Sequence, residues 1–140
     1  MLTLASIAAA RIPAWSASVS DVVYAETNRT AANFILVFNQ ADSGSPTFLA
    51  STPVGGIGVF DATFGLGAFD SDQNLTVKPA RTLLFAVNSG SNSIAVFRIH
   101  PDGSLEAVAG SPFPSGGVDL VSIGATDDIL TLVNKDEDPA

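Results

Sequence analysis

A run of alternating apolar and turn-forming residues occurs almost twice in this 140-residue chain. The second copy, residues 83–108, reads LLFAVNSGSNSIAVFRIHPDGSLEAV, which is three short β-type runs separated by tight turns. Six residues of the first copy match the second at one constant offset: Asn33, Ile35, Val37, Phe38, Gly44 and Ser45 correspond to Asn92, Ile94, Val96, Phe97, Gly103 and Ser104. Because a repeated unit fixes strand order and neighbours together, this duplication constrains the fold most strongly.

The remaining sequence also reads as short β-type runs separated by Gly, Asn, Asp and Pro. No stretch after the N-terminus has a helical period. The pattern predicts an all-β protein with nine strands, near residues 22–27, 33–39, 46–51, 74–78, 82–88, 93–99, 104–109, 118–124 and 128–134.

The strand expected at 93–99 is apolar on both faces. Ile94 and Val96 face one way, whereas Ala95, Phe97 and Ile99 face the other. A two-layer sandwich usually leaves one face of each sheet polar, so this strand must be covered on both sides. Recurring sheets with two apolar faces indicate radial stacking, that is, a β-propeller built from four-stranded antiparallel blades.

The repeat divides the chain into one whole blade and two partial ones. Residues 74–110 supply a full blade, residues 22–52 supply a blade that lacks its inner strand, and residues 118–134 begin a third. The third is recognised because Leu130, Val133 and Asn134 match Leu84, Val87 and Asn88. Residues 21–140 are therefore expected to form about two to two and a half blades.

The first 20 residues carry an apolar run followed by small residues, and two interpretations stay open: a signal peptide or a disordered N-terminus. The first would make the protein secreted, the second is compatible with the cytoplasm. Two Asn-x-Thr triplets, at Asn28 and Asn74, would suit glycosylation but are common by chance in such a chain.

Charge and composition argue against several partners. The formal net charge is −8 with only six Lys and Arg residues, so nucleic acid and anionic membrane surfaces are not expected partners. No apolar run approaches the roughly 20 residues of a membrane span. The chain has no cysteine, which excludes disulfides and thiolate metal sites.

Uncovered blade faces and open strand edges predict self-association.

The full blade resembles a known family. Its Ala86-Val87-Asn88 run, the Gly90-Ser91-Asn92 turn, Val96-Phe97, Asp102-Gly103 and Ser115-Gly116-Gly117 look like the lactonase family of seven-bladed propellers, which includes 6-phosphogluconolactonase and 3-carboxymuconate cyclase-like proteins with YVTN- or WD40-like repeats. The resemblance covers roughly residues 22–138. One turn departs from it: this chain reads Lys78-Pro79-Ala80-Arg81 where the family usually has a Pro-Asp-Gly-Arg-like turn.

The resemblance implies an enzyme of carbohydrate metabolism that acts on a lactone ring, as a hydrolase or as a lactonising isomerase, with a lactone or carbohydrate-derived ligand. Seven blades of about 40 to 50 residues need more than twice this length. The chain is therefore interpreted as a truncated, N-terminal portion of such a propeller, expected to be inactive alone. The alternative is a non-catalytic propeller that binds or scaffolds a partner.

Candidate site residues are expected on one propeller face, formed by residues 28–33, 53–73, 89–92, 110–118 and 135–138. Its charged members are Arg29, Asp61, Asp70, Asp72, Asp119 and Lys135. No position matches a family catalytic motif, so the catalytic residues stay unassigned.

Other motifs favour structural interpretations. His100 could act as a general base, but it lies in an HPDG turn expected on the opposite face. Asp70, Asp72 and Asn74 resemble the start of a calcium loop that Leu75 and Arg81 do not complete. The glycines of GGIGVFDATFGLG form no nucleotide motif. Phe60, Phe64 and Phe69 are expected to pack between blades, the alternative being that they plug the mouth of the central channel. No metal or cofactor is expected.

Overall fold

The computed structural model describes residues 22–40, 45–59 and 74–136. Several features discussed above lie outside these residues: the segment 1–20, the match at Gly44, the charged residues Asp61, Asp70 and Asp72, and the aromatic residues Phe60, Phe64 and Phe69. The interpretations of these features stay predictions.

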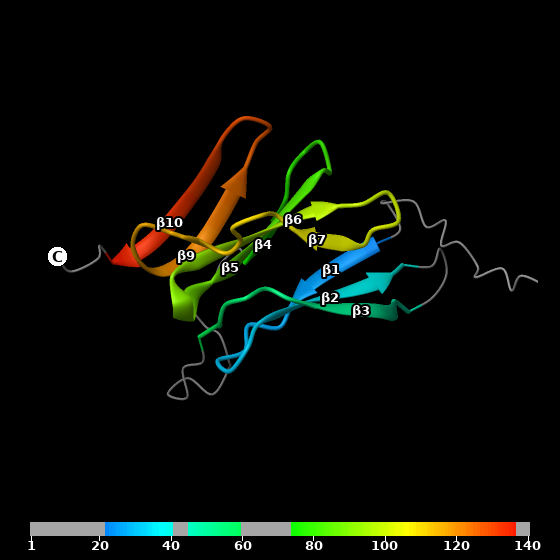
Figure 1. Cartoon of the computed structure of the whole chain (residues 1–140), viewed down its shortest axis with the longest axis horizontal. Coiled ribbons are helices and arrows are strands. Elements are labelled where there is room, and N and C mark those ends of the chain that lie inside the picture. The colour runs from blue at the N-terminus through cyan, green and yellow to red at the C-terminus, as the bar shows by residue number, and fades with distance from the viewer. Residues whose placement is uncertain (1–21, 41–44, 60–73, 137–140) are drawn as a thin grey trace, which may run out of the picture.

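The described chain forms three antiparallel β-sheets, drawn in Figure 1. The first sheet has the order β1-β2-β3, the central sheet β4-β5-β6-β7 with β8 beside β6, and the third sheet pairs β9 with β10. The elements are β1 (Val22–Glu26), β2 (Phe34–Asn39), β3 (Thr47–Pro53), β4 (Leu75–Val77), β5 (Leu83–Asn88), the 3-10 turn η2 (Ser89–Ser91), β6 (Ser93–Ile99), β7 (Leu105–Ala107), β8 (Phe113–Pro114), β9 (Val118–Ala125) and β10 (Leu130–Asp136). The all-β prediction is confirmed, and each of the nine expected runs contains a strand.

The outer strand of the central sheet differs from the prediction. It was expected as one run over 104–109, but it consists of two pieces, β7 and β8, that pair with opposite ends of β6. Between the pieces, Gly110 takes a positive φ of 87° and turns the chain away. The Ser111 hydroxyl accepts the backbone N–H of Val96 at 2.8 Å and so replaces the missing strand neighbour.

The first and central sheets share the same register. Ile35 pairs with Glu26, and its sequence counterpart Ile94 pairs with Val87. In the same way Val37 pairs with Tyr24, whereas its counterpart Val96 pairs with Phe85. Glu26 and Val87 are therefore equivalent positions, as are Tyr24 and Phe85.

The central sheet is covered on both faces, as the apolar pattern of residues 93–99 predicts. One face packs against the first sheet, and this hydrophobic cluster contains Ile35, Val37, Val54, Leu84, Ala86, Ala95, Phe97 and Ile99. The other face packs against the third sheet, through Phe85, Val87, Ile94, Val96, Leu120 and Ile123. Figure 1 shows the green and yellow central strands between the blue-green first sheet and the orange-red third sheet.

The packing direction repeats. The first sheet contacts the central sheet through Val22, Tyr24, Ile35 and Val37, and the central sheet contacts the third through the equivalent Leu83, Phe85, Ile94 and Val96. The outer sheets leave apolar side chains exposed on the faces they do not share, including Val23 and Phe48 on the first sheet and Val133 on the third. Within the described ranges, no helix has the length and apolar character to cross a membrane.

Candidate functional site

Loops from the first and central sheets meet at one end of the molecule, which we call the loop end: residues 27–33, 54–59, 88–92 and 115–119. The Gly58 N–H donates to the Arg29 carbonyl at 2.8 Å, and the Gly90 N–H donates to the Ile57 carbonyl at 3.1 Å. The Ser115 N–H donates to the Asn92 carbonyl at 2.8 Å. The predicted gathering of these loops is confirmed for the part of the chain that the structure describes.

Two Gly-Gly segments enter the loop end in the same way. Gly55 and Gly116 have positive φ values of 75° and 79°, which glycine adopts without strain. The glycine that follows each one lies directly against an asparagine side chain: a Cβ on Gly56 would stand 2.4 Å from Cγ of Asn88, and a Cβ on Gly117 would stand 2.6 Å from Nδ2 of Asn134. Gly56 and Gly117 therefore leave the space that these asparagines occupy.

A buried chain of polar side chains crosses from the first to the central sheet at the loop end. Asn33 and Asn88 are both fully buried, and the Asn33 amide donates to Oδ1 of Asn88 at 3.3 Å. The Asn88 amide donates to the Ser93 hydroxyl at 3.4 Å, which lies 3.1 Å from the hydroxyl of Ser91. Buried amides need such partners, so this hydrogen-bond network fixes the relative position of the two sheets.

Glu26 lies at the first-sheet end of this hydrogen-bond network. Its Oε1 accepts the Asn33 amide at 2.6 Å, while its Oε2 is buried and has no hydrogen-bond partner among the described residues. Burial raises the pKa of Glu26 to about 8, against a smaller lowering by the Asn33 hydrogen bond. The sequence analysis missed Glu26: at the constant offset of the repeat it aligns with Phe85, and its equivalence to Val87 follows from the strand pairing.

Of the predicted charged residues, Lys135 and Asp119 form an ion pair at this end. Lys135 Nζ lies 3.6 Å from the Asp119 carboxylate, and both side chains are partly exposed. The Asp119 N–H donates to Oδ1 of Asn92 at 2.7 Å, so the turn positions this residue through its backbone. Arg29 is exposed. Partly exposed pairs of this kind add little stability, roughly 0 to 1 kcal/mol.

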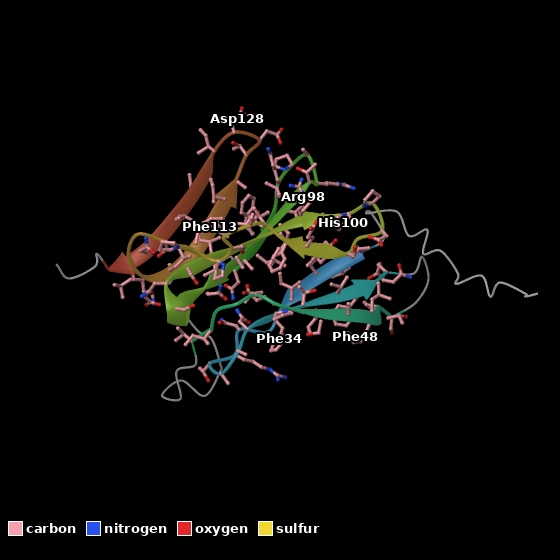
Figure 2. The ribbon with its side chains drawn as sticks, in the orientation of Figure 1. Phe34, Phe48, Arg98, His100, Phe113 and Asp128 are labelled. Atoms are coloured by element: carbon pink, nitrogen blue, oxygen red, sulfur yellow. The ribbon has the colours of Figure 1, made fainter. Side chains whose placement is uncertain are left out.

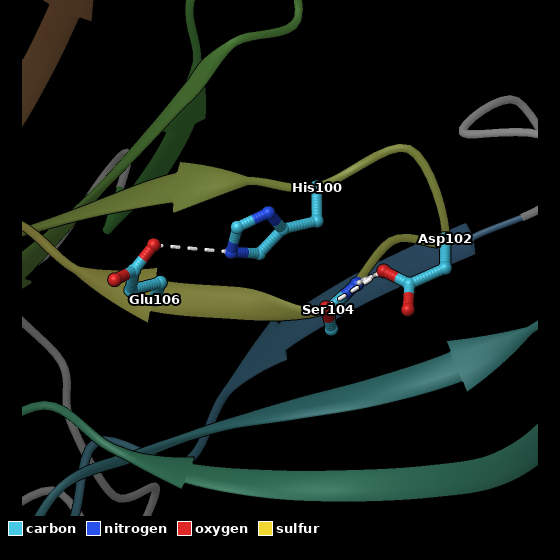
Figure 3. Close-up of polar contacts among 4 residues, drawn as sticks. All are labelled: His100, Asp102, Ser104 and Glu106. Carbon is cyan, nitrogen blue, oxygen red and sulfur yellow. Dashed lines mark hydrogen bonds and ion pairs between the residues drawn. The ribbon is translucent and has the colours of Figure 1, made fainter.

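His100 lies away from the loop end, in the turn between β6 and β7, as predicted (Figure 2). Its Nε2 is 3.2 Å from the Glu106 carboxylate, and the Ser104 hydroxyl donates to Asp102 at 2.7 Å (Figure 3). His100 and Ser104 thus pair with separate carboxylates, so this turn lacks the serine–histidine contact of a nucleophilic triad.

The same turn is docked on the first sheet. The Tyr24 hydroxyl donates to the Gly103 carbonyl at 2.8 Å, and burial, with a smaller contribution from the Asp102 charge, raises the pKa of Tyr24 to about 12. A hollow of about 260 Å³ lies beside this contact, lined by Val37, Leu49, Ala50, Thr52, Asp102, Gly103, Ser104 and Leu105. Asp102 is the ionisable residue of this lining, so the hollow offers little acid–base chemistry.

No three His, Cys, Asp or Glu residues of the described ranges group as metal ligands would. Of the calcium-like run, Asn74 is described, and its Oδ1 is buried without a partner among these residues. Beside Arg29 and the Asp119–Lys135 pair, the loop end therefore offers neutral hydrogen-bonding groups and the half-buried carboxyl of Glu26, a set that suits an uncharged polar ligand better than a metal. Comparisons with protein-family models, with curated proteins and with solved structures find no match to this chain.

Proposed function

We propose that the chain is the N-terminal portion of a seven-bladed, lactonase-like β-propeller, and that its loop end faces a lactone or carbohydrate-derived ligand. The three sheets would be successive blades: a blade without its inner strand, a complete blade and the first half of a third. The function of the whole propeller would be hydrolysis of a sugar lactone, or formation or isomerisation of a lactone of the muconate type.

One observation carries the proposal: the same face of each sheet packs on the opposite face of the next. Val37 in the first sheet and the equivalent Val96 in the central sheet both lie in the interface with the sheet that follows in the sequence. A two-layer sandwich buries each sheet on one face, whereas radial stacking requires this directional repeat. The repeat therefore supports a propeller arrangement.

The resemblance supplies the chemical part of the proposal. Three of its most specific runs lie at strand ends or turns: Ala86-Val87-Asn88 ends β5, Gly90-Ser91-Asn92 forms the turn into β6, and Ser115-Gly116-Gly117 precedes β9. Two of these three runs lie at the loop end. Their backbone and amide groups could orient the hydroxyls of a sugar lactone, and a propeller that contributes further blades would supply the groups that stabilise an oxyanion and activate water.

The test measures ligand binding and turnover separately. Gluconolactone, 6-phosphogluconolactone and muconolactone are added to the labelled chain, and amide chemical shifts of residues 88–92 are compared with those of residues 100–104. The proposal expects shifts at the loop end and none at the His100 turn, with turnover in a version extended by the missing blades. Shifts confined to the His100 turn, or no turnover of any of the three lactones by the extended version, would reject it.

A second candidate is a non-catalytic propeller that binds or scaffolds a partner. It is favoured by the charge arrangement at the loop end, where the described Asp119 and Lys135 neutralise each other and leave Arg29 as the one remaining cation of residues 27–33, 54–59, 88–92 and 115–119 to hold a phosphorylated lactone. This alternative predicts ligand-induced shifts at the loop end without turnover.

A further inference from the structure

Glu26 occupies a position where the repeated fold otherwise places an apolar residue. Its equivalent in the central sheet, Val87, is 1 % exposed and packs against the third sheet. Glu26 puts a carboxyl at the corresponding place, next to the interface between the first and central sheets. Apolar replacement of a buried ionised group is often neutral or stabilising, so packing alone does not require this carboxyl. Residues that break a local rule in this way are typical of functional positions.

The carboxyl is tied to the central sheet through one amide. Asn33 Nδ2 donates to Oε1 of Glu26 at 2.6 Å and to Oδ1 of Asn88 at 3.3 Å. Asn33 is held in place because its Oδ1 accepts the Thr27 hydroxyl at 2.9 Å and the Phe34 N–H at 3.1 Å. A change in the charge of Glu26 therefore acts on the amide that bridges the two sheets.

The surroundings of the carboxyl favour its neutral form. The group that bonds it, Asn33, is uncharged, and so are Thr27 of the first sheet and Asn88 of the central sheet, which bond Asn33. Its pKa is raised by burial, the largest cause, and lowered by the Asn33 hydrogen bond. An ionised Oε2 would be an anionic oxygen without a donor among these residues, which is costly in a buried position.

We propose that Glu26 is a proton-operated latch between the first and central sheets. The neutral carboxyl lets the Asn33 amide bridge to Asn88 and keeps the loop end closed. Loss of the proton leaves Oε2 as an unpaired anionic oxygen at the sheet interface. It also strengthens the bond from the Asn33 amide to Oε1 at the expense of the longer bond to Asn88, which loosens the loop end. This latch does not depend on the identity of the ligand, so it stands apart from the lactone proposal.

The sign of the pH dependence follows from linkage. The pKa of Glu26 in the folded state, about 8, lies above the ordinary value of 4.5. Between these two values the folded state keeps a proton that the unfolded state has lost, so the folding equilibrium constant falls as pH rises, by up to about tenfold per pH unit. Below pH 4.5 the contribution is complete, and above pH 8 no further loss is expected.

The test follows the Glu26 carboxyl carbon by NMR from pH 4 to 10 in the full chain, with denaturant unfolding over the same range. Glu26→Gln identifies the resonance and removes the proton, and Glu106→Gln, at an exposed carboxyl, is the matched control. We expect a midpoint near pH 8, a shift of the Asn88 side-chain amide with the same midpoint, and a decline in folding constant that Glu26→Gln abolishes and Glu106→Gln keeps.

Three results would overturn the latch: a Glu26 midpoint near 4.5, an Asn88 amide that does not respond at the Glu26 midpoint, or a wild-type pH slope that persists in Glu26→Gln. Should Glu26→Gln fail to fold, Glu26→Val takes its place, because it recreates the Val87 position of the central sheet. It is expected to raise the folding constant at pH 8 and above, and a loss of stability there would equally contradict the proposal.

Discussion

The two interfaces of the central sheet use equivalent strand positions but differ in polarity. The second interface, with the third sheet, is aliphatic and aromatic at Phe85 and Val87. The first has Tyr24 and Glu26 at the equivalent positions. The Tyr24 hydroxyl donates to the Gly103 carbonyl and Oε1 of Glu26 accepts from Asn33, whereas Oε2 of Glu26 has no partner among the described residues. One packing scheme therefore accommodates either an apolar contact or a polar one.

The difference shows which of the two interfaces should depend on pH. The second interface combines apolar burial with a buried hydrogen bond from the Ser89 hydroxyl to the Leu120 carbonyl at 2.7 Å, and neither is sensitive to pH. The first interface contains a titratable carboxyl, so its strength varies with pH. The predictions below alter these features in turn, beginning with the largest expected effect.

Removal of the Phe97 ring should damage the first interface most. Phe97 is 1 % exposed and lies in the cluster shared by the first and central sheets. Phe97→Ala is expected to lower the free energy of unfolding by about 3 to 5 kcal/mol, measured by denaturant titration. Phe48→Ala is the control, because Phe48 is 55 % exposed and should change stability by far less. Equal losses in the two variants would contradict the assignment of Phe97 to this core.

A methyl group at Gly56 should disturb Asn88, the asparagine that the first Gly-Gly segment accommodates. Its Cβ would stand 2.4 Å from Cγ of Asn88, which is too close without movement. Gly56→Ala is expected to destabilise the protein by about 1 to 3 kcal/mol in equilibrium unfolding. In the double variant Gly56→Ala/Asn88→Ala, the two losses should be less than additive, since the clash is removed. Strict additivity would mean that the two residues do not interact.

Exchange of the equivalent aromatic residues should reveal the polarity difference directly. Tyr24→Phe removes the hydroxyl bonded to Gly103 and should cost about 1 kcal/mol, because a buried carbonyl loses its partner. Phe85→Tyr places a hydroxyl in the apolar second interface and should cost about 1 to 3 kcal/mol unless the hydroxyl reaches solvent. Thermal unfolding of both variants tests this, and two neutral exchanges would show that the interfaces do not differ as described.

The smallest effect is expected at the exposed turn. The hydrogen bond from the Ser104 hydroxyl, with a further one from its backbone N–H, lowers the pKa of Asp102 below the usual 3.8. A lowered carboxyl pKa gives stability that is present above pH 3.8 and is lost as pH falls through the folded value. Ser104→Ala should therefore slightly reduce stability near neutral pH and flatten this acid-side loss, as seen in melting temperatures between pH 2 and 6. An unchanged pH profile would contradict the role of Ser104.

The sequence predicted the strands and the two apolar faces because both follow from local alternation. Residues 93–99 place apolar side chains on both faces of the strand, which requires a neighbour on each side. The Gly-rich turns could be assigned to one end from strand direction alone. The short strand β8 could not be predicted, because two residues that include a proline carry no periodic signal.

The hydrogen-bonded bridge of Glu26, Asn33 and Asn88 could not be predicted from a sequence pattern. The interface position of Glu26 follows from its pairing with Ile35, and the partnership of Asn33 with Asn88 depends on the packing of two sheets far apart in the sequence. At the constant offset of the sequence repeat Glu26 aligns with Phe85, so its equivalence to the buried Val87 is visible only from the strand pairing. The catalytic residues, which the sequence left unassigned, stay unassigned.

The most direct test of the stacked arrangement is a methyl nuclear Overhauser experiment on the central sheet. The account predicts contacts from Ala86 and Ala95 to Ile35 and Val37 of the first sheet, and separate contacts from Val87 and Val96 to Leu120 and Ile123 of the third. Contacts from both sets of methyl groups to one and the same sheet, or from only one set to any neighbour, would contradict it.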